Sequence, residues 1–475
     1  MRVHVARVFA GHPLAAEILH RLREAGHTAV LVGGVVRDAV LAELRGERLV
    51  AQDVDIATSA SPAEVRRLFP DHTVLTVGER FGVVVVVGPD GRSYEVASFR
   101  TEQGYRDGRR PDEVRWGTLD EDVQRRDFTV NGLVATEDGE VLDRVGGIPD
   151  LMAGRVRAIG DPGTRFDEDR LRMLRAVRFA CQLGFAIEEK TAAAIRDRAP
   201  RITSVSWERI RDELIRILAT PRSGEGILLL DRLGLLAPML PEIAALRGVP
   251  QPEEYHPEGD VFAHTVAALG VGDLLWDDPR LKLGILFHDV GKPSALARSG
   301  GGNMSGHCSL GAEVASRALL RLRFPKRDVE WVTYLVREHM RVARLPEMGL
   351  GKQVRLLGAG EDEVAPLEEL PRRFPLFADL LRLVVCDAEA SAHRARAWEP
   401  LLERAVGLLV HLRRIHGIRR ARELLTGDDL LALGFSPGPR LGEALDLIHE
   451  RILAGEIATR EEALAHALRL ARGHR

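Results

Sequence analysis

The stretch that decides the fold reads Leu31-Val32-Gly33-Gly34-Val35-Val36-Arg37-Asp38, with Gln52-Asp53-Val54-Asp55-Ile56 close behind it. The first segment predicts a strand over residues 29–32, a glycine turn, and then a helix. Backbone N–H groups at a helix start favour phosphate, and glycine lets it come close. Asp53 and Asp55, two apart on a strand, point to the same face. Together the segments predict a site for a triphosphate and a divalent metal.

The paired carboxylates suit one kind of reaction. Attack of a hydroxyl on an α-phosphate builds negative charge on the phosphate oxygens, and Mg²⁺ ions held by carboxylates stabilise that charge. Residues 94–99 predict a further strand, which carries Glu95 as a candidate third carboxylate. The sequence also allows two non-functional interpretations. Asp53 and Asp55 could be solvated loop residues, and Glu95 could be a solvated strand residue.

A second polar segment, Arg125-Arg126-Asp127-Phe128-Thr129-Val130-Asn131-Gly132-Leu133, follows later in the chain. Paired arginines suit bidentate phosphate contacts, and Asp or Asn suits sugar hydroxyls. With the glycine turn and the Asp-x-Asp pair, this segment resembles the class II tRNA nucleotidyltransferases and their bacterial poly(A) polymerase relatives, over nearly the whole chain. Gly132 stands where alanine is more usual in that family, a departure that should not alter the chemistry.

The resemblance implies roles for individual residues. Asp53 and Asp55 would be the catalytic metal ligands and would hold Mg²⁺. The nucleotide-binding set from these two segments would be Gly33, Gly34, Arg37, Asp38, Arg126, Asp127 and Asn131. Residues 100–111, rich in Gly, Arg and Asp, predict a mobile loop. This segment resembles the flexible loop of relatives that add the terminal A and that CC-only enzymes lack; a plain solvated loop is the alternative.

Base selection is expected in Phe166-Asp167-Glu168-Asp169-Arg170-Leu171-Arg172-Met173-Leu174-Arg175-Ala176. Leu171, Leu174 and Val177 form an apolar helical stripe, which leaves Asp169 and Arg172 together on another face. Cytosine and adenine both offer an amino donor beside a ring nitrogen acceptor, whereas uracil and guanine present the wrong pattern. The segment resembles the family's protein template for CTP and ATP, with Glu168 as orienter and Arg175 in the nucleotide-binding set. A surface ion pair within one helix is the alternative.

A second constellation lies further along the chain. It consists of imidazoles and carboxylates, which suit first-row divalent ions: His264, His288, Asp289, His307, His339 and Asp387. Their order and spacing resemble the HD phosphohydrolase superfamily. The resemblance implies that His264, His288, Asp289 and Asp387 are core ligands and that His307 and His339 serve a second metal. The identity of the divalent metal is left open, and so is whether the site hydrolyses phosphate esters.

Composition sets the outer limits. The 475 residues exceed one core, and 67 basic against 70 acidic residues give a net charge of −3, so no global basic field indicates nucleic acid. The cysteines Cys181, Cys308 and Cys386 show no pair spacing, which favours a reducing compartment. No 18-residue apolar run and no secretion signal occur. We therefore expect a cytoplasmic protein without a membrane partner.

The pattern predicts an α+β head with a mixed sheet, followed by an all-α neck, HD domain and tail. The expected bounds are 1–150 for the nucleotidyltransferase head, 151–247 for the neck, 248–395 for the HD domain and 396–475 for the tail. An amphipathic helix is expected over residues 203–218, and a linker over 248–254. In the tail, Thr426 or Asp428 should cap one helix, and residues 434–438 should turn into a second. Similar tails in relatives imply contact with the elbow of tRNA.

The resulting hypothesis is template-independent addition or repair of the 3′-terminal CCA of tRNA from CTP and ATP, with release of pyrophosphate. A poly(A) polymerase or an A-adding enzyme shares the same motifs. A rival of another class is an HD phosphohydrolase that acts on nucleotides or RNA ends. The third rival is an RNA-binding chaperone without catalysis. The sequence leaves the oligomeric state open.

Overall fold

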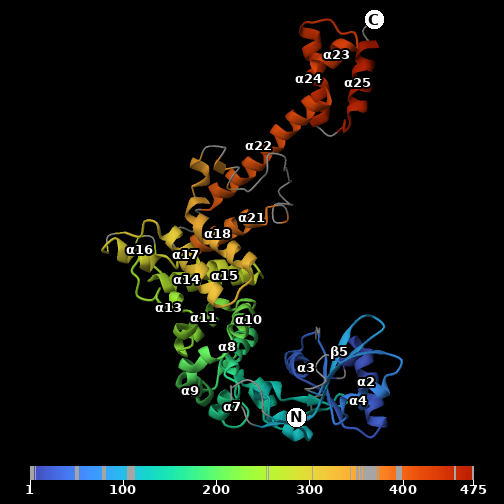
Figure 1. Ribbon diagram of the computed structural model, residues 1–475, viewed down its shortest axis with the longest axis vertical. Coiled ribbons are helices and arrows are strands. Elements are labelled where there is room, and N and C mark those ends of the chain that lie inside the picture. Colours follow the sequence, from blue (N-terminus) through green and yellow to red (C-terminus); the bar gives the residue numbers. More distant parts are fainter. Residues whose placement is uncertain are drawn as a thin grey trace. The chain divides into compact units, whose positions relative to one another are not determined.

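The computed structural model describes residues 5, 7–48, 53–76, 82–103, 113–252, 254, 256–301, 303–342, 344–348, 352–353, 356, 372, 374–391, 398–453 and 456–472. The chain divides into two compact units. The first comprises Met1–Val249, Asp260–Leu286 and Ser316–Val329, and the second comprises Pro250–Gly259, Phe287–Ala315 and Glu330–Arg475. Figure 1 shows the elements of both units.

The head of the first unit is built on a seven-stranded sheet with the strand order β3-β4-β5-β2-β1-β8-β9. The strands are β1 (Ala29–Val32), β2 (Asp55–Thr58), β3 (Thr73–Leu75), β4 (Val83–Val87), β5 (Ser93–Ser98), β8 (Val134–Ala135) and β9 (Val141–Leu142). Strands β2 and β5 run parallel and the other neighbours antiparallel, so the sheet is mixed as the sequence predicted. Burial alternates along β4 and β5, which is the period of a half-buried strand, whereas β1 and β2 are buried over three consecutive residues.

Helices surround this sheet (Figure 1). They are α1 (Arg7–Gly11), α2 (Pro13–Glu24), α3 (Gly34–Arg45), α4 (Pro62–Leu68), α5 (Leu119–Gln124), α6 (Gly147–Met152) and the single turn η2 (Thr129–Asn131). Buried side chains such as Ile18 and Leu22 of α2 and Ile56 and Val96 of the sheet form the core between the layers. The predicted strand at 29–32 and the helix after it are confirmed, because a buried apolar run followed by two glycines leaves little choice.

The predicted mobile loop over residues 100–111 is wrong at its start. Residues 100–103 form β6 (Arg100–Gln103), which pairs antiparallel with β7 (Glu113–Trp116) in a separate two-stranded sheet. An antiparallel pair of strands can face solvent, so its strands can contain polar residues. Residues 104–112, the rest of the predicted loop, lie outside the described residues.

The chain then becomes helical, as predicted. The helices of this part are α7 (Pro162–Glu168), α8 (Leu171–Leu183), α9 (Glu189–Arg198), η3 (Ala199–Ser204), α10 (Trp207–Leu218), α11 (Ser223–Arg232), α12 (Leu236–Met239), α13 (Pro241–Ala244), α14 (Val261–Leu275) and α15 (Pro279–Phe287). One short parallel pair, β10 (Arg155–Val156) with β11 (Ala186–Ile187), is an addition to the expected all-helical neck. The helix expected from residue 203 begins only at Trp207, since residues 199–204 form a 3-10 turn.

The remaining helices are α16 (Lys292–Arg298), α17 (His307–Arg321), α18 (Lys326–Val342), η4 (Leu345–Glu347), α21 (Pro375–Ala390), α22 (Glu399–Leu424), α23 (Gly427–Ala432), α24 (Pro439–Leu453) and α25 (Arg460–Arg472). In the tail, Thr426 caps α23 through a reciprocal bond with Asp429, and α24 follows the glycine turn; both predictions are confirmed. Among the described residues, no helix combines the length and the apolar character needed to cross a bilayer.

Candidate functional site

The glycine turn after β1 is shaped for close approach. Gly33 has φ +78°, a left-handed conformation that favours glycine, and a Cβ there would lie 3.3 Å from Asp55 Oδ2. Gly34 begins α3. One turn later the buried Arg37 donates to Asn131 Oδ1 at 2.8 Å and to Asp38 Oδ1 at 2.8 Å. The turn is thereby fixed to residues almost a hundred positions away.

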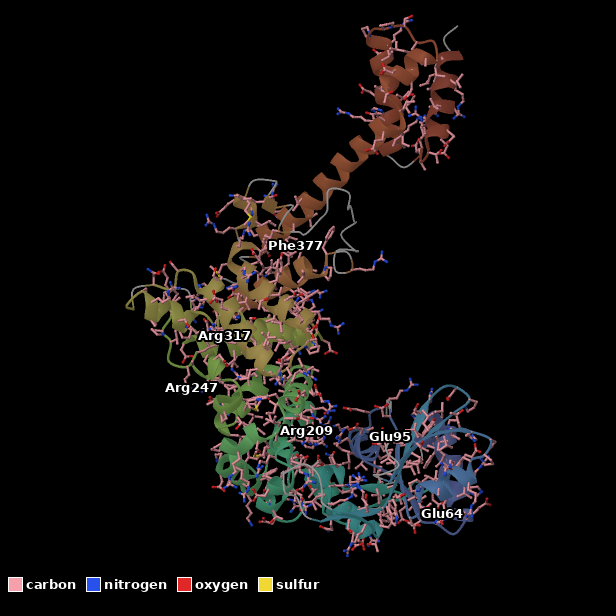
Figure 2. All side chains as sticks on the ribbon, in the orientation of Figure 1. Glu64, Glu95, Arg209, Arg247, Arg317 and Phe377 are labelled. Carbon is pink, nitrogen blue, oxygen red and sulfur yellow. The ribbon has the colours of Figure 1, made fainter. Side chains whose placement is uncertain are left out.

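Carboxylates gather beside this turn. In the register of the sheet Asp55 of β2 stands next to Glu95 of β5, and Figure 2 labels Glu95 on the head. Asp53 lies two residues before β2 begins, with the buried Val54 between the two acids. Burial raises the pKa of Asp55, and the negative charges of Glu95 and Asp53 raise it further. Carboxylates that repel one another at an open site fit a divalent cation such as Mg²⁺.

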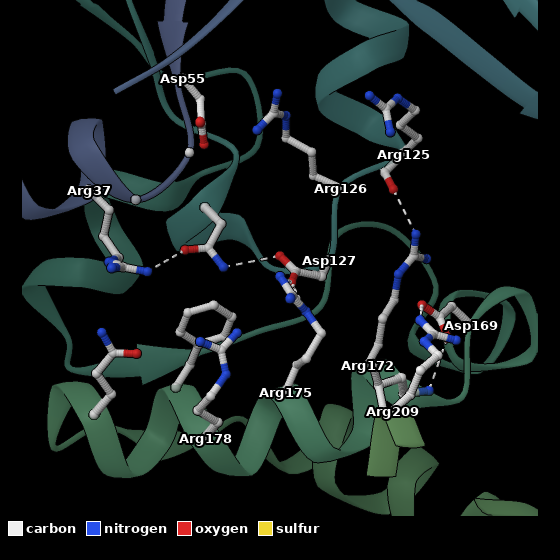
Figure 3. A pocket seen from close by; sticks show the side chains of 16 residues that line it. Arg37, Asp55, Arg125, Arg126, Asp127, Asp169, Arg172, Arg175, Arg178 and Arg209 are labelled. Atoms are coloured by element: carbon white, nitrogen blue, oxygen red, sulfur yellow. Dashed lines mark hydrogen bonds and ion pairs between the residues drawn. The ribbon is translucent and has the colours of Figure 1, made fainter. Parts of the chain in front are cut away.

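A cavity of about 500 Å³ opens next to the turn, and Figure 3 shows it from close by. Its walls carry seven arginines and three aspartates, so its charge suits a polyphosphate. The lining residues are Gly33, Gly34, Arg37, Asp55, Arg125, Arg126, Asp127, Asn131, Asp169, Leu171, Arg172, Arg175, Arg178, Phe179, Gln182 and Arg209. Ten of them were candidates from the sequence. Four other candidates, Asp38, Asp53, Glu95 and Glu168, are not part of its lining.

One hydrogen-bonded chain crosses the cavity. Asn131 accepts from Arg37 and donates through Nδ2 to Asp127 Oδ1 at 3.0 Å, and Arg175 Nε donates to Asp127 Oδ2 at 2.8 Å (Figure 3). Burial opposes ionisation of Asp127, but Arg175 and the hydrogen bonds outweigh it and hold the pKa of that carboxyl below its usual value. The head and α8 are thus joined by charged groups that a bound nucleotide would meet.

An aromatic ring organises the arginines. The guanidinium carbons of Arg37, Arg175 and Arg178 lie 5.3, 5.4 and 4.3 Å from the centre of the Phe179 ring. Cation–π contact with one ring keeps several arginines near one another despite their repulsion. Arg178, Phe179 and Gln182 were not predicted from the sequence. They continue the helical spacing of Arg172 and Arg175, which could have indicated that all five lie on one face of α8.

The expected placement of Asp169 and Arg172 on one face of a single helix is wrong. Helix α7 ends at Glu168 and α8 begins at Leu171, so Asp169 lies between two helices in extended conformation. Its Oδ1 accepts from the N–H of Leu171 at 3.1 Å, and its Oδ2 accepts from Arg209 at 2.8 Å. Arg172 instead donates to Glu168 Oε2 at 2.7 Å. An aspartate just before a helix tends to accept hydrogen bonds from the first backbone N–H groups rather than to adopt a helical conformation, which explains why α7 and α8 are separate helices.

A second cluster of ionisable groups lies in the second unit. Asp289 Oδ2 is 3.3 Å from His288 Nε2 and 2.6 Å from Lys292 Nζ, and His288 Nε2 is 3.9 Å from Asp387 Oδ1. Burial opposes ionisation of Asp289, but the neighbouring His288 and Lys292 hold the pKa of its carboxyl well below the usual range. His264, a further candidate, belongs to the first unit, where it is fully buried on α14.

The other carboxylate oxygen of Asp289 faces two more imidazoles. Asp289 Oδ1 lies 3.6 Å from His307 Nε2 and 3.9 Å from His339 Nε2. Burial lowers the pKa of His307, and burial with the charge of His288 lowers that of His339 to about 4, so both rings are neutral near pH 7. Neutral imidazoles and an ionised carboxylate are the forms that bind a metal. The five residues of this unit therefore fit divalent ions, whose identity they do not fix.

Two glycines set the distance between these elements. A Cβ on Gly291, the residue before α16, would lie 2.0 Å from the carbonyl oxygen of His307 and 2.4 Å from the N of Gly311. Only a glycine allows the backbones to meet in this way. This contact brings the start of α17, with His307, against the turn that carries Asp289.

Four family models match parts of the chain. The family model "Poly A polymerase head domain" matches residues 29–157, "Probable RNA and SrmB- binding site of polymerase A" matches 184–246, "HD domain" matches 261–370, and a tRNA nucleotidyltransferase domain 2 model matches 408–468. The CCA-adding enzyme of Lacticaseibacillus paracasei is 34% identical over 447 residues, which cover 93% of this chain and 92% of that protein. The chain belongs to the CCA-adding enzymes.

Other CCA-adding enzymes match in part or in structure. The chain spans about half the length of the relative from Limosilactobacillus reuteri, with 46% identity over 43% of this chain and 49% of that one. The crystal structure of the Bacillus stearothermophilus CCA-adding enzyme in complex with CTP is 28% identical, covers 97% of both chains and has a TM-score of 0.57. The Thermotoga maritima CCA-adding enzyme complexed with tRNA, at 18% identity and a TM-score of 0.54 over 99% of both chains, shares the fold.

Membership places this chain among the tRNA nucleotidyltransferases. The head model covers the glycine turn, the carboxylates and the segment with Asp127. The HD model covers His264 to His339 but ends before Asp387, so the position of Asp387 beside His288 is known from the structure alone.

Proposed function

We propose that this chain adds or repairs the 3′-terminal CCA of tRNA, using CTP and ATP and releasing pyrophosphate. The observation that carries the proposal is the arginine-lined cavity directly beside Asp55 and the glycine turn. Seven guanidinium groups suit a triphosphate, and the carboxylates beside them suit the Mg²⁺ that nucleotidyl transfer requires. The relatives in Lacticaseibacillus paracasei and Bacillus stearothermophilus carry the name of this activity.

Each set of residues has a proposed role. Asp53 and Asp55, with Glu95 as third carboxylate, hold Mg²⁺, which stabilises charge on the phosphate oxygens. Gly33 and Gly34 admit the triphosphate. The remaining nucleotide-binding set contacts phosphates and sugar and comprises Arg37, Asp38, Arg126, Asp127, Asn131 and Arg175.

Base choice is assigned to Asp169 and Arg172, with Glu168 as orienter. Although the two residues do not pair with each other, both line the cavity. Arg172 donates to Glu168 at 2.7 Å, and Asp169 accepts from Arg209 at 2.8 Å, so each side chain is held in place by its own partner. An acceptor and a donor fixed separately suit the amino group and ring nitrogen of cytosine or adenine, and they leave uracil and guanine with unpaired groups.

Rival functions predict different products. A poly(A) polymerase or an A-adding enzyme would use the same carboxylates and arginines. The relative from Lacticaseibacillus paracasei, which this chain matches over 92% of its length, is named a CCA-adding enzyme and favours CCA addition instead. A chaperone without catalysis has no use for carboxylates beside an arginine-lined cavity.

The cluster around Asp289 supports a second function. We assign His288, Asp289 and Asp387 to one divalent ion and His307 with His339 to another; His264 stays a predicted ligand. Ions held in this way activate water for hydrolysis of phosphate esters, which would suit nucleotides or RNA ends. Contact of the tail with the tRNA elbow and a location in the cytoplasm stay predictions, the latter supported by three free cysteines.

The decisive experiment resolves products to single nucleotides. The purified chain with Mg²⁺ receives CTP, ATP or both, on tRNA that ends at the discriminator base and on tRNA that ends in CC. Addition of C, C and A followed by a halt supports the proposal. Growth only from the CC substrate indicates an A-adding enzyme, and a long A ladder indicates a poly(A) polymerase. Absence of any extension would move the function to the cluster around Asp289.

A further inference from the structure

Cys308 lies beside the imidazoles of the second unit. It follows His307 at the start of α17, and its Sγ lies 3.5 Å from His307 Nε2. The ligand atoms of His307, Cys308 and His339 all lie within 4.8 Å of one another. Neither of the other two cysteines takes part in a group of this kind among the described residues.

The imidazoles of His307 and His339 face each other through their Nε2 atoms. His307 Nδ1 is 3.0 Å from the carbonyl oxygen of Met304, and His339 Nδ1 is 2.8 Å from that of Val336. A carbonyl oxygen can only accept, so each Nδ1 carries the hydrogen and each neutral ring turns the lone pair of Nε2 towards the other ring. The two Nε2 atoms lie 3.4 Å apart. Two lone pairs at this distance repel unless a cation lies between them.

The distances agree with four-coordinate zinc chemistry. Zn–N bonds of about 2.0–2.1 Å and Zn–S bonds of about 2.3 Å at tetrahedral angles place two nitrogens about 3.3 Å apart, and a nitrogen and a sulfur about 3.5 Å apart. The structure has 3.4 Å between the imidazole nitrogens and 3.5 Å between Sγ and His307 Nε2. Two of the three distances between ligand atoms therefore match one tetrahedral ion, and the third, between Cys308 and His339, lies within 4.8 Å.

We propose that His307, His339 and the Cys308 thiolate form a binding site for one borderline-soft divalent ion of the zinc class. A thiolate ligand favours such an ion over Mg²⁺ or Ca²⁺, which prefer oxygen. On binding, the thiol loses its proton to solvent and a metal–sulfur bond forms. This site is separate from the ion assigned to His288 and Asp387, and it holds whether or not the chain transfers nucleotides.

Cobalt provides a direct test, since Co²⁺ replaces Zn²⁺ in tetrahedral sites and a thiolate ligand gives it a charge-transfer absorption in the near ultraviolet. Chelated full-length chain is titrated with Co²⁺ and then with Zn²⁺. The variants are Cys308→Ala, the matched control Cys181→Ala, which removes a buried thiol of α8, and Asp387→Ala. Circular dichroism reports whether each variant is folded, and bound zinc is measured by mass spectrometry.

The wild type should show the sulfur-to-cobalt band, and added Zn²⁺ should abolish it. Cys181→Ala and Asp387→Ala should keep the band. Cys308→Ala should lose it and bind Zn²⁺ at least about tenfold more weakly, because a direct ligand should matter no less than the outer-shell partners that cost about 10–100-fold. A wild type without the band, a band that persists in Cys308→Ala, or one that disappears in Asp387→Ala would overturn the proposal. The wild-type result decides even if a variant does not fold.

Discussion

The cavity of the head and neck and the cluster around Asp289 are built on opposite plans. The cavity presents seven arginines, and two of its three aspartates, Asp127 and Asp169, are already paired with arginines far along the chain. The cluster presents the neutral imidazoles of His307 and His339 beside the buried carboxylate of Asp289. The first arrangement suits an anionic ligand and the second a cation.

The two sites differ in which existing interactions are lost when a ligand binds. In the cavity, an arginine that turns to a phosphate leaves an aspartate behind, so binding exchanges one charged partner for another. In the cluster, the Nε2 atoms of His307 and His339 lie 3.4 Å apart with their lone pairs turned towards each other, so a cation between them relieves this repulsion. We therefore expect nucleotide affinity to depend on pairs of residues and metal affinity on single ligands.

The largest expected effect separates the two regions. Asp55→Ala should lower nucleotide incorporation by about a thousandfold or more, because metal-assisted charge stabilisation contributes several kcal/mol to the transition state. The metal content of the second unit should not change. Incorporation is measured by single-turnover extension of tRNA. The control is Asp138→Ala, an exposed acid in a turn of the head. Activity within about tenfold of wild type in Asp55→Ala would remove this residue from the catalytic set.

Gly291→Ala should damage the other region. Its Cβ would meet the carbonyl oxygen of His307 at 2.0 Å, so the start of α17 must move away from Asp289. Such overpacking costs about 1–3 kcal/mol or more, and bound metal should fall with it. Nucleotide incorporation should stay near wild type.

The matched control for Gly291→Ala is Gly407→Ala, on the exposed side of α22, where a Cβ would meet nothing within 4 Å. It should be neutral or stabilising by up to about 1 kcal/mol. Thermal unfolding and metal content measure both variants. Equal metal content in the two would show that the glycine contact does not position His307.

A smaller effect tests whether the pairs in the cavity matter. Arg209→Ala removes the partner of Asp169, so CTP and ATP incorporation should fall about tenfold, the equivalent of one charged hydrogen bond. Discrimination against UTP should fall as well, since Asp169 would lose its orientation. Arg209→Lys should restore part of both. Arg211→Ala, on the same helix and bonded to Asp212, is the control. Reduced activity with unchanged discrimination would assign Arg209 a purely structural role.

Sequence was sufficient where the determining interactions are local. The strand at 29–32, the glycine turn and the capping of α23 by Thr426 follow from neighbouring residues, and the structure has them where they were expected. The order of the histidines and aspartates likewise indicated one cluster, of which five members lie together in the second unit.

Sequence failed where a partner comes from far along the chain. Asp169 pairs with a residue 40 positions away and Asp127 with one 48 positions away, and helical spacing cannot indicate either. The spacing of Asp169 and Arg172 instead suggested one shared helical face, because it assumed an unbroken helix. Cys308 was considered only for disulfide spacing, so its place beside His307 could not be seen until the fold was known.

The smallest expected effect is a pH dependence of the metal-free second unit. Burial and the neighbouring His288 lower the pKa of His339 to about 4, from 6.5 for an ordinary histidine. The native state therefore resists a proton that the unfolded chain accepts, and stability should be complete above about pH 6.5 and decrease as the pH falls towards about 4. Chelated protein should lose a few degrees of Tm for each kcal/mol lost in this window. His339→Gln should flatten the dependence, whereas the exposed His20→Gln should not. A dependence that survives His339→Gln would assign the proton to another group, and the contrast between the neutral imidazoles of the cluster and the charged cavity would then rest on geometry alone.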